Sequence, residues 1–435
     1  MLKKGRLGMK RIIYLCFFIT LFLTACSESE INEAHTTQMY NSTKAPQVGQ
    51  IENNYFEEYK TLITPDNRLG IVRTPPAPDY TKVHPGKLTQ LPTPDAQSLT
   101  KGIDIRSADL SGLDLRNKRK ELLNSDFDSV TKWPLVLPSR FSPQDTMQLG
   151  KNPGLGVRNL HRKGITGKNV GLAIIDESLL VEHIEYRDRL KMYEEIHNRD
   201  VTATMHGPAV ASIAVGKTVG VAPEADLYFI ANTAGYWRNG NFEYDLMWLA
   251  QSIDRIIQVN RTLTKENKIR VISISLTLDT SKKGYDKVKE SIEKAKKEGI
   301  YTVYCNSDPL YCLGRNPMRD PDDFNSFVKG GFWADSTEAI VNKLFVPMDS
   351  RCTASPTGSD DYVFYRYGGM SWSVPYVAGL YALACQVYPD ITPEIFWNEA
   401  FKTGSIFEVD NNGNKVALGK IVNPVKLIDN IQNLK

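Results

Sequence analysis

Short apolar runs alternate with stretches of helical periodicity along most of the chain after residue 152. Five runs are continuous enough to form strands that are buried on both faces of a sheet, namely 170–175, 227–230, 271–276, 300–304 and 344–346. Residues 246–257 and 288–295 place apolar side chains at helical spacing, and Thr392 is a typical N-cap for a helix that ends at Gly404. This alternation predicts an α/β fold with a doubly wound, mostly parallel sheet that has helices on both faces.

The chain before residue 150 lacks this alternation. Residues 27–96 are polar and interrupted by prolines, which is typical of a stalk. Residues 103–135 carry more apolar positions but are too few to bury a core of their own, so we expect them to pack on the main domain. They could be a permanent brace or a prosegment that is removed on maturation. The absence of a dibasic or flexible processing site at 133–138 favours the brace.

The N-terminus has the pattern of an export signal. Lys10 and Arg11 precede an apolar run at 12–23, which is too short for a spanning helix of about 20 residues. The Leu-Thr-Ala-Cys sequence that ends at Cys26 resembles a bacterial lipobox, in which the cysteine receives diacylglycerol and becomes the new N-terminus. We therefore expect a lipoprotein signal peptide at 1–25 and a lipid anchor on the extracytoplasmic face of the cell membrane.

The charge balance adds little to this picture. The chain has 53 basic and 50 acidic residues, and five of the basic ones precede the apolar run of the signal. The mature chain therefore has no basic excess, and we expect no nucleic-acid partner. After the signal, we expect an N-terminal stalk and packing segment or prosegment at 26–150 and a main domain at 151–435.

Cysteines are too sparse for a disulfide scaffold. Four lie in the part that is expected to fold, Cys305, Cys312, Cys352 and Cys385, and three pairings are possible. Cys305 and Cys385 lie within apolar runs, which favours buried thiols. Cys312 with Cys352 is the one pairing that the sequence leaves worth testing.

Three residues have positions from which they could carry nucleophilic chemistry. Asp176 directly follows the first apolar run, His206 begins a helix of small residues, and Ser371 lies in a glycine-rich segment before another helix. The carboxyl ends of parallel strands meet at one edge of a sheet, so such residues can come together there. Each one alone is more typical of a helix cap or a turn.

Taken together, four segments resemble the subtilisin-like serine peptidases: Thr166 to Asp176, His206-Gly207, Gly220 to Leu227 and Gly369 to Gly379. The resemblance covers about residues 150–403. It implies a serine endopeptidase in which Asp176 orients the base, His206 is the general base and Ser371 is the nucleophile. It also implies a protein or peptide substrate, and neither a cofactor nor a metal ligand set is predicted; structural calcium is left open.

The same resemblance extends to the surroundings of these three residues. Asn306 ends a strand and is similar to the family's oxyanion asparagine, whose side chain stabilises the tetrahedral intermediate. Ser275, Leu276 and Thr277 resemble the segment that pairs with the substrate as an added strand and lines the specificity pocket. Met370 stands where the family has threonine, a departure that concerns the shape of the pocket and leaves the proton-transfer groups in place.

Other classes of protein fit the sequence less well. An α/β-hydrolase needs a histidine after its serine, and residues 372–435 contain none. The His-Glu-x-x-His motif of a zinc peptidase is absent, and His183 is a weaker candidate for the base than His206. Two alternatives stay open: a catalytically impaired relative that binds peptides or protein partners, and a solute-binding lipoprotein, which would not account for the matched segments.

Overall fold

The computed structural model describes residues 59–434 apart from 66–67, 81–82, 85, 95–101, 332–340 and 412–413. The expected signal peptide and Cys26 lie outside these residues. Within the described residues, no helix is both long and apolar enough to cross a membrane.

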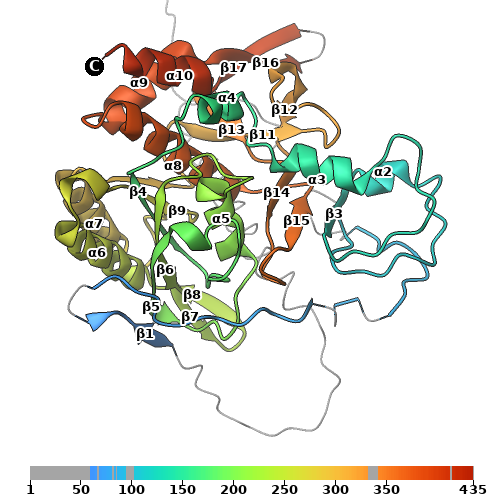
Figure 1. The fold of residues 1–435 in the computed structure, drawn as a ribbon, viewed down its shortest axis with the longest axis horizontal. Helices are drawn as coiled ribbons and strands as arrows, with labels where there is room; N and C mark the ends of the chain where they lie inside the picture. The colour runs from blue at the N-terminus through green and yellow to red at the C-terminus, as the bar shows by residue number, and fades with distance from the viewer. Residues whose placement is uncertain are drawn as a thin grey trace, which may run out of the picture. The chain divides into compact units, whose positions relative to one another are not determined.

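A six-stranded sheet forms the centre of the described chain (Figure 1). Its order is β1-β5-β6-β4-β9-β10, and all neighbours are parallel except β1, which pairs antiparallel with β5 at one edge. The strands are β1 (Lys60–Leu62), β4 (Gly171–Asp176), β5 (Leu190–Asn198), β6 (Asp226–Asn232), β9 (Ile269–Ile274) and β10 (Tyr301–Tyr304). Four of the five predicted apolar runs are therefore confirmed as strands of one sheet.

Helices cover both faces of this sheet. On one face, α6 (Met247–Thr262) and α7 (Tyr285–Lys297) share a core with Ala173 and Ile175 of β4. On the opposite face, α5 (His206–Val215) and α8 (Met370–Val387) pack on each other and on the central strands. Alternate side chains of each strand thus enter two different cores, as expected of continuous apolar runs. The predicted α/β architecture is confirmed.

A second sheet of five strands lies beside α8 and has the order β12-β11-β13-β17-β16. Its strands are β11 (Leu310–Arg315), β12 (Phe327–Lys329), β13 (Lys343–Pro347), β16 (Ser405–Asn411) and β17 (Asn414–Ile421). The fifth predicted run forms β13 and so belongs to this sheet. The helix α9 (Pro393–Thr403) begins as predicted at Thr392, whose hydroxyl accepts a hydrogen bond from the Ile395 amide at 3.3 Å. The last helix, α10 (Pro424–Gln432), packs on α8 and α9.

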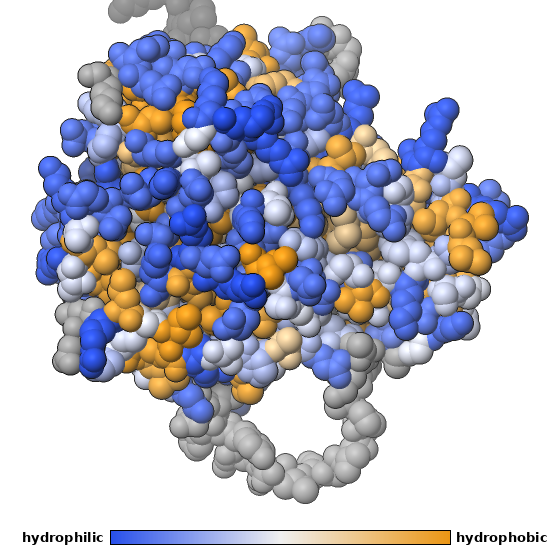
Figure 2. All heavy atoms as spheres, in the orientation of Figure 1, coloured by the Kyte–Doolittle hydropathy of each residue, from blue (hydrophilic) through white to orange (hydrophobic). Residues whose placement is uncertain are grey.

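Shorter elements connect these layers: α4 (Val157–Arg162), the hairpin strands β7 (Gly235–Arg238) and β8 (Asn241–Tyr244), and the 3₁₀ helices η3 (Arg187–Arg189), η4 (Lys265–Asn267) and η5 (Phe324–Ser326). The face seen in Figure 2 is mostly hydrophilic, with several small groups of apolar side chains, one of them at the lower left of the view. Exposed apolar residues of the described chain include Ile63 and Ile71 near β1, and Leu135 and Val136. Isolated exposures of this kind are ordinary and mark no site.

Residues 102–142, here called the N-terminal segment, share a sheet with the main domain. The sheet has the order β14-β15-β3-β2, and its strands are β2 (Ile103–Asp104), β3 (Ser125–Asp128), β14 (Arg351–Ala354) and β15 (Tyr362–Tyr365). The segment also carries α2 (Arg119–Leu122), and α3 (Pro143–Lys151) follows it against β14. Phe127 stacks on Phe364 of β15 with 5.1 Å between ring centroids. Most buried apolar side chains of the segment form one cluster, which Phe364 of the main domain completes. The segment thus supplies most of a small core of its own, contrary to the prediction that it could bury apolar side chains only on the main domain. Leu135 and Val136 stay exposed.

The polar stretch that was expected to be a stalk packs on the main domain from residue 59 onward. Its strand β1 extends the main sheet, and Arg73 forms an ion pair with Glu195 of β5 at 2.6 Å. Further along, the Ala203 amide donates a hydrogen bond to the Pro76 carbonyl at 2.9 Å. The stalk prediction is wrong for this part because backbone pairing at a sheet edge needs no apolar periodicity.

All four cysteines of the folded part are buried, and none of them is in a disulfide bond. The pairing of Cys312 with Cys352 is therefore not formed. Burial raises the pKa of Cys352 and of Cys385 to about 12, so both thiols stay protonated at neutral pH. Their role is that of small apolar side chains.

Candidate active site

The structure brings Asp176 and His206 together at the carboxyl end of β4. The Nδ1 atom of His206 lies 2.6 Å from the Asp176 Oδ1 atom, and both side chains are largely buried. A carboxylate can only accept hydrogen bonds, so Nδ1 carries the proton and Nε2 of the neutral ring is the basic nitrogen. The Glu177 amide donates to the same Oδ1 at 2.8 Å and helps to orient the carboxylate.

A close backbone approach sets this geometry. Helix α5 begins at His206, and the next residue, Gly207, lies directly against the chain that leaves β4. A Cβ atom at Gly207 would lie 2.4 Å from the Glu177 carbonyl oxygen and 2.9 Å from that of Ser178, so only glycine fits without a shift. The glycine after the histidine therefore allows the imidazole to reach the strand end.

Ser371 is the second residue of α8 and lies at the carboxyl end of β9. Its Oγ donates to the Ser275 carbonyl at 3.3 Å, while the Ser275 Oγ donates to the Ser371 carbonyl at 2.9 Å. The next residue, Trp372, places its ring 5.4 Å from the His206 ring, measured between centroids. The starts of α5 and α8 therefore meet at the edge of the sheet where β4 and β9 end.

Asn306 follows β10 and spans to the chain that leaves β9. Its Nδ2 donates to the Leu278 carbonyl at 3.0 Å, and its Oδ1 accepts from the Leu278 amide at 2.9 Å. The Leu276 carbonyl accepts from the Cys305 amide at 3.1 Å, which ties the same two chain segments together. Asn306 thus supports the segment of Ser275, Leu276 and Thr277, while its oxyanion role and their substrate contacts stay predictions.

His183, the weaker candidate for the base, makes its hydrogen bonds outside the Asp176–His206 pair. Its ring is fully buried, and Nε2 pairs with the Asp361 carbonyl at 2.8 Å. Burial lowers the pKa of His183, in keeping with a neutral ring that has a structural role.

Two residues of the site have no motif of their own in the sequence. Glu177 directly follows Asp176; burial, the largest effect, raises the pKa of its carboxyl to about 7, with the nearby charges of Asp200 and Asp176 adding to the rise and His206 opposing it. Trp372 directly follows Ser371 and covers the His206 ring. The only sequence signal for either residue is its position next to a predicted one.

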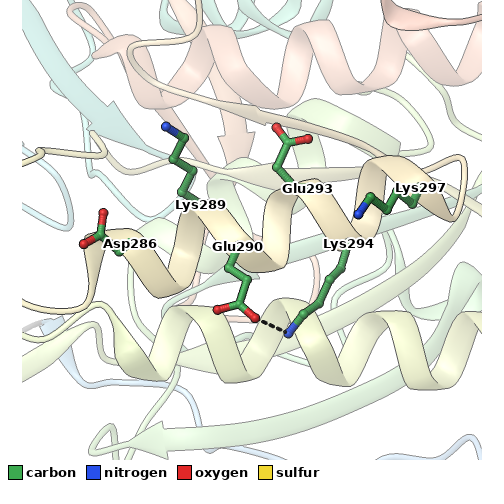
Figure 3. A pocket seen from close by; sticks show the side chains of 6 residues that line it. All are labelled: Asp286, Lys289, Glu290, Glu293, Lys294 and Lys297. Carbon is green, nitrogen blue, oxygen red and sulfur yellow. Dashed lines mark ion pairs between the residues drawn. The ribbon is translucent and has the colours of Figure 1, made fainter.

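Two hollows lie on the described surface. One, of about 550 Å³, is lined by the charged and polar residues of the loop before His206 and by their partners, among them Arg73, Glu195, Asp200 and Thr204. The other is a shallow hollow on α7, lined by Asp286, Lys289, Glu290, Glu293, Lys294 and Lys297 (Figure 3). Glu290 and Lys294 pair there at 3.4 Å, as neighbours on an exposed helix face do. Among the described residues, no group of three or more potential ligands is arranged to hold a metal ion.

Comparisons with known proteins bear on the family of this chain. Residues 167–310 match the model of the "Subtilase family", a range that includes Asp176, His206 and Asn306 and ends before Ser371. Proteins named "Subtilisin-like protease 2" from Trichophyton verrucosum and Trichophyton equinum are 31% and 30% identical over 225 residues. Each alignment covers 50% of this chain and 50% of the relative, so the chain spans about half the length of the curated relatives it matches.

Among solved structures, one titled "Structure of Prenylagaramide maturation protease PagA" covers 64% of this chain and 99% of its own, with 15% identity and a TM-score of 0.44. The family assignment comes from the sequence matches.

Proposed function

We propose that this chain, which carries a domain of the subtilase family, is a serine endopeptidase. The observation that supports the proposal best is the 2.6 Å contact between Asp176 and His206, with Ser371 at the neighbouring strand end. In this proposal Ser371 is the nucleophile, His206 the general base and Asp176 the group that orients and stabilises the imidazole.

The first half of the reaction forms an acyl-enzyme. The Ser371 hydroxyl turns from the Ser275 carbonyl toward Nε2 of His206, which takes the proton as Oγ attacks the carbonyl carbon of the scissile bond. The negative charge on the tetrahedral oxygen is stabilised by the Ser371 amide at the start of α8 and by the predicted donor Asn306. His206 then passes the proton to the leaving amine, and the peptide bond breaks.

The second half repeats these steps with water. Nε2 of His206 removes a proton from a water molecule, which attacks the ester carbonyl of acylated Ser371. The ester bond breaks, the proton returns to Oγ, and the carboxylic acid product leaves. Asp176 keeps Nδ1 protonated throughout, so the same nitrogen performs both proton transfers.

Two contacts favour the alternative, a catalytically impaired relative that binds peptides. The Ser371 hydroxyl donates to a backbone carbonyl, and both ends of the Asn306 amide are engaged by Leu278. A nucleophile and an oxyanion donor with these partners suit a peptide groove that holds a ligand without cleaving it. The two proposals differ only in whether Ser371 reacts.

Labelling with an organic fluorophosphonate separates the two proposals. An active site should form a covalent adduct that peptide mapping places on Ser371, and Ser371→Ala should abolish both labelling and peptide hydrolysis while leaving the fold intact. Ser111→Ala is the matched control, because Ser111 is an exposed serine outside the candidate site whose hydroxyl bonds Asp109. Full hydrolysis by Ser371→Ala would overturn the assignment, and an unlabelled but peptide-binding wild type would favour the alternative.

We further propose that the protein is tethered to the outer face of the cell membrane through diacylated Cys26. The basis is the lipobox-like sequence after the apolar run, since two acyl chains give stable attachment where one gives only marginal binding. Cys26→Ala should release the protein from the membrane fraction or block its processing. Cys16→Ala, which changes a cysteine within the apolar run, serves as the control and should leave attachment unchanged. Equal pelleting of both variants would place the anchor elsewhere.

A further inference from the structure

The loop that leads into Ser371 is held at three successive residues by polar groups, of which Asp349 is buried and Asn124 and Asp126 are partly buried. It leaves β15 at Tyr365 and passes through Arg366, Tyr367 and Gly368 before α8 begins at Met370. Its backbone and side-chain partners come from two parts of the chain that are distant in sequence.

One set of partners lies in the N-terminal segment. The Arg366 amide donates to Asp126 Oδ1 at 2.7 Å, across 240 residues of sequence. The Tyr367 hydroxyl donates to the Asn124 Oδ1 atom at 2.6 Å. Both partners belong to β3 or the residue before it, and β3 is itself paired with β15. The N-terminal segment therefore forms hydrogen bonds with this loop directly after β15, the strand with which β3 pairs.

The other partner is Asp349, in the turn between β13 and β14. Its side chain accepts from the Gly368 amide at 2.9 Å through Oδ1 and from the Gly331 amide at 3.0 Å through Oδ2. Gly368 fits tightly here, because a Cβ atom would lie 2.8 Å from the Met348 carbonyl oxygen. The loop is thus fixed from two sides, three to five residues before the nucleophile.

We propose that Asp126 and Asn124 of the N-terminal segment, together with Asp349, are positioning residues that hold the Ser371 hydroxyl in register with His206. The N-terminal segment would then be a working part of the active site and would have to stay attached in the mature protein. This inference deepens the proposed function and rests on it. These hydrogen bonds, here called the clamp, affect the position of Ser371 alone, since Asp176 and His206 are placed by β4 and α5.

The charged groups around Asp126 and Asp349 are compatible with a rigid support for the loop. Asp126 faces the charges of Arg106, Asp104 and Arg366, and Asp349 faces those of Arg366 and Arg315. Burial raises the pKa of each carboxyl to about 7, yet each keeps its backbone donors. A carboxyl or a neutral amide oxygen can accept these bonds equally well, whereas an alanine cannot. Removing the Asp126 acceptor would leave the partly buried Arg366 amide without this partner, which perturbs the loop.

The test compares Asp126→Ala with Asp126→Asn, which keeps the shape and an acceptor oxygen. Asp126→Ala should lower kcat and the rate of fluorophosphonate labelling by about 10- to 100-fold, with little change in KM, because a small displacement of a reacting atom costs this much. Asp126→Asn should retain most of the rate. Tyr367→Phe, which removes one hydroxyl from the loop, should show a smaller loss of the same kind. Asp114→Ala is the matched control, since Asp114 is an exposed aspartate of the same segment that pairs with Arg116.

Hydrogen exchange at residues 366–371, followed by mass spectrometry, provides a readout that does not depend on activity. Asp126→Ala and Tyr367→Phe should speed exchange there relative to wild type and Asp114→Ala. Unchanged exchange and unchanged labelling in both variants would overturn the clamp. Faster exchange in a protein whose wild type never reacts at Ser371 would support the clamp and refute the peptidase proposal. If Asp126→Ala does not fold, Tyr367→Phe alone decides between these results.

Discussion

The two halves of the candidate site are held in different ways. Asp176 ends β4, and His206 begins α5, which follows the neighbouring strand β5 of the same sheet and approaches the end of β4 closely at Gly207. Ser371 is the second residue of α8, and the loop before it is supported by β3 near the N-terminus and by the turn after β13. The acid and base thus depend on local packing in the main sheet, and the nucleophile depends on polar contacts between distant segments.

This difference indicates where the site is vulnerable. The central sheet is stabilised by apolar cores on both faces, so Asp176 and His206 should stay in place as long as the domain is folded. A loop held by a few buried hydrogen bonds can lose its geometry when one acceptor is removed. Substitutions in the N-terminal segment should therefore disturb the position of Ser371 more than the positions of Asp176 and His206.

The largest effect is expected when His206 is removed. Combining this change with Ser371→Ala tests whether the two halves of the candidate site act in one reaction step. His206→Ala should lower kcat/KM by about 10⁴- to 10⁶-fold, because the nucleophile loses its proton acceptor. Adding Ser371→Ala should cause almost no further loss, since residues that act together in one step are strongly non-additive. Steady-state kinetics of the single and double variants measure this. Fully additive losses would mean that the two halves do not share a reaction step.

The next effect concerns the core that supports the nucleophile. Phe127→Ala should lower the free energy of unfolding by about 3–5 kcal/mol, because it opens a cavity between β3 and β15. Chemical denaturation measures the loss. Phe396→Ala, which opens a comparable buried site in α9, is the matched control.

Hydrogen-exchange rates then separate local support of the loop at residues 366–371 from the stability of the whole domain. Under conditions where both variants remain folded, only Phe127→Ala should speed hydrogen exchange at residues 366–371. Faster exchange in the Phe396→Ala variant as well would mean that the nucleophile loop responds to global stability and has no special support from the N-terminal segment.

A smaller effect is expected where the acid and base are positioned. Gly207→Ala should lower the free energy of unfolding by about 1–3 kcal/mol and reduce activity, because the new Cβ would clash with the Glu177 carbonyl. Gly112→Ala is the control, since a Cβ atom there meets nothing within 4 Å, and it should change stability by less than about 0.5 kcal/mol. Thermal unfolding and labelling rates report the two properties. Equal behaviour of both variants would contradict the close approach of α5 to β4.

The last prediction concerns the pH dependence of stability. Burial raises the pKa of Asp126 from 3.8 to about 7, so the folded protein keeps this proton at pH values where the unfolded chain has released it. Stability should therefore fall as pH rises from about 4 to about 7, and Asp126→Asn should flatten this slope. Asp114→Asn is the control, because the pKa of Asp114 is lowered to about 2 and its contribution changes below this window. Denaturation midpoints at several pH values measure the slopes, and parallel slopes for wild type and Asp126→Asn would contradict the prediction.

Much of the main sheet could be predicted from apolar runs, but β5 could not. Its sequence includes Glu194, Glu195 and His197, which break any apolar period, yet all three are buried in the structure. Glu194 is stabilised by Arg255 of α6 at 2.8 Å, and Glu195 by Arg73. A strand whose buried charges depend on partners far along the chain gives no local signal.

The candidate site likewise contains residues that a local pattern indicates and residues that only distant partners explain. Asp176, His206 and Ser371 could be found because each lies in a short segment with a recognisable pattern. Asp126 and Asp349 could not, since an aspartate in a polar stretch is indistinguishable from a turn residue until its distant donors are known. Sequence patterns therefore indicate the residues proposed to react, and not the residues that support the loop before Ser371.

The three-residue strand β1 has a consequence for the self-association of the protein. It covers the outer edge of β5, a strand of nine residues that includes Met192, Tyr193 and Ile196. An uncovered edge of this length and apolar character is a template on which other chains can add strands. A catalytic domain that began near residue 150 would present this edge to its neighbours and should aggregate, whereas a chain that retains residues 59–94 keeps the edge occupied. The short N-terminal strand thus protects the colloidal stability of the whole domain.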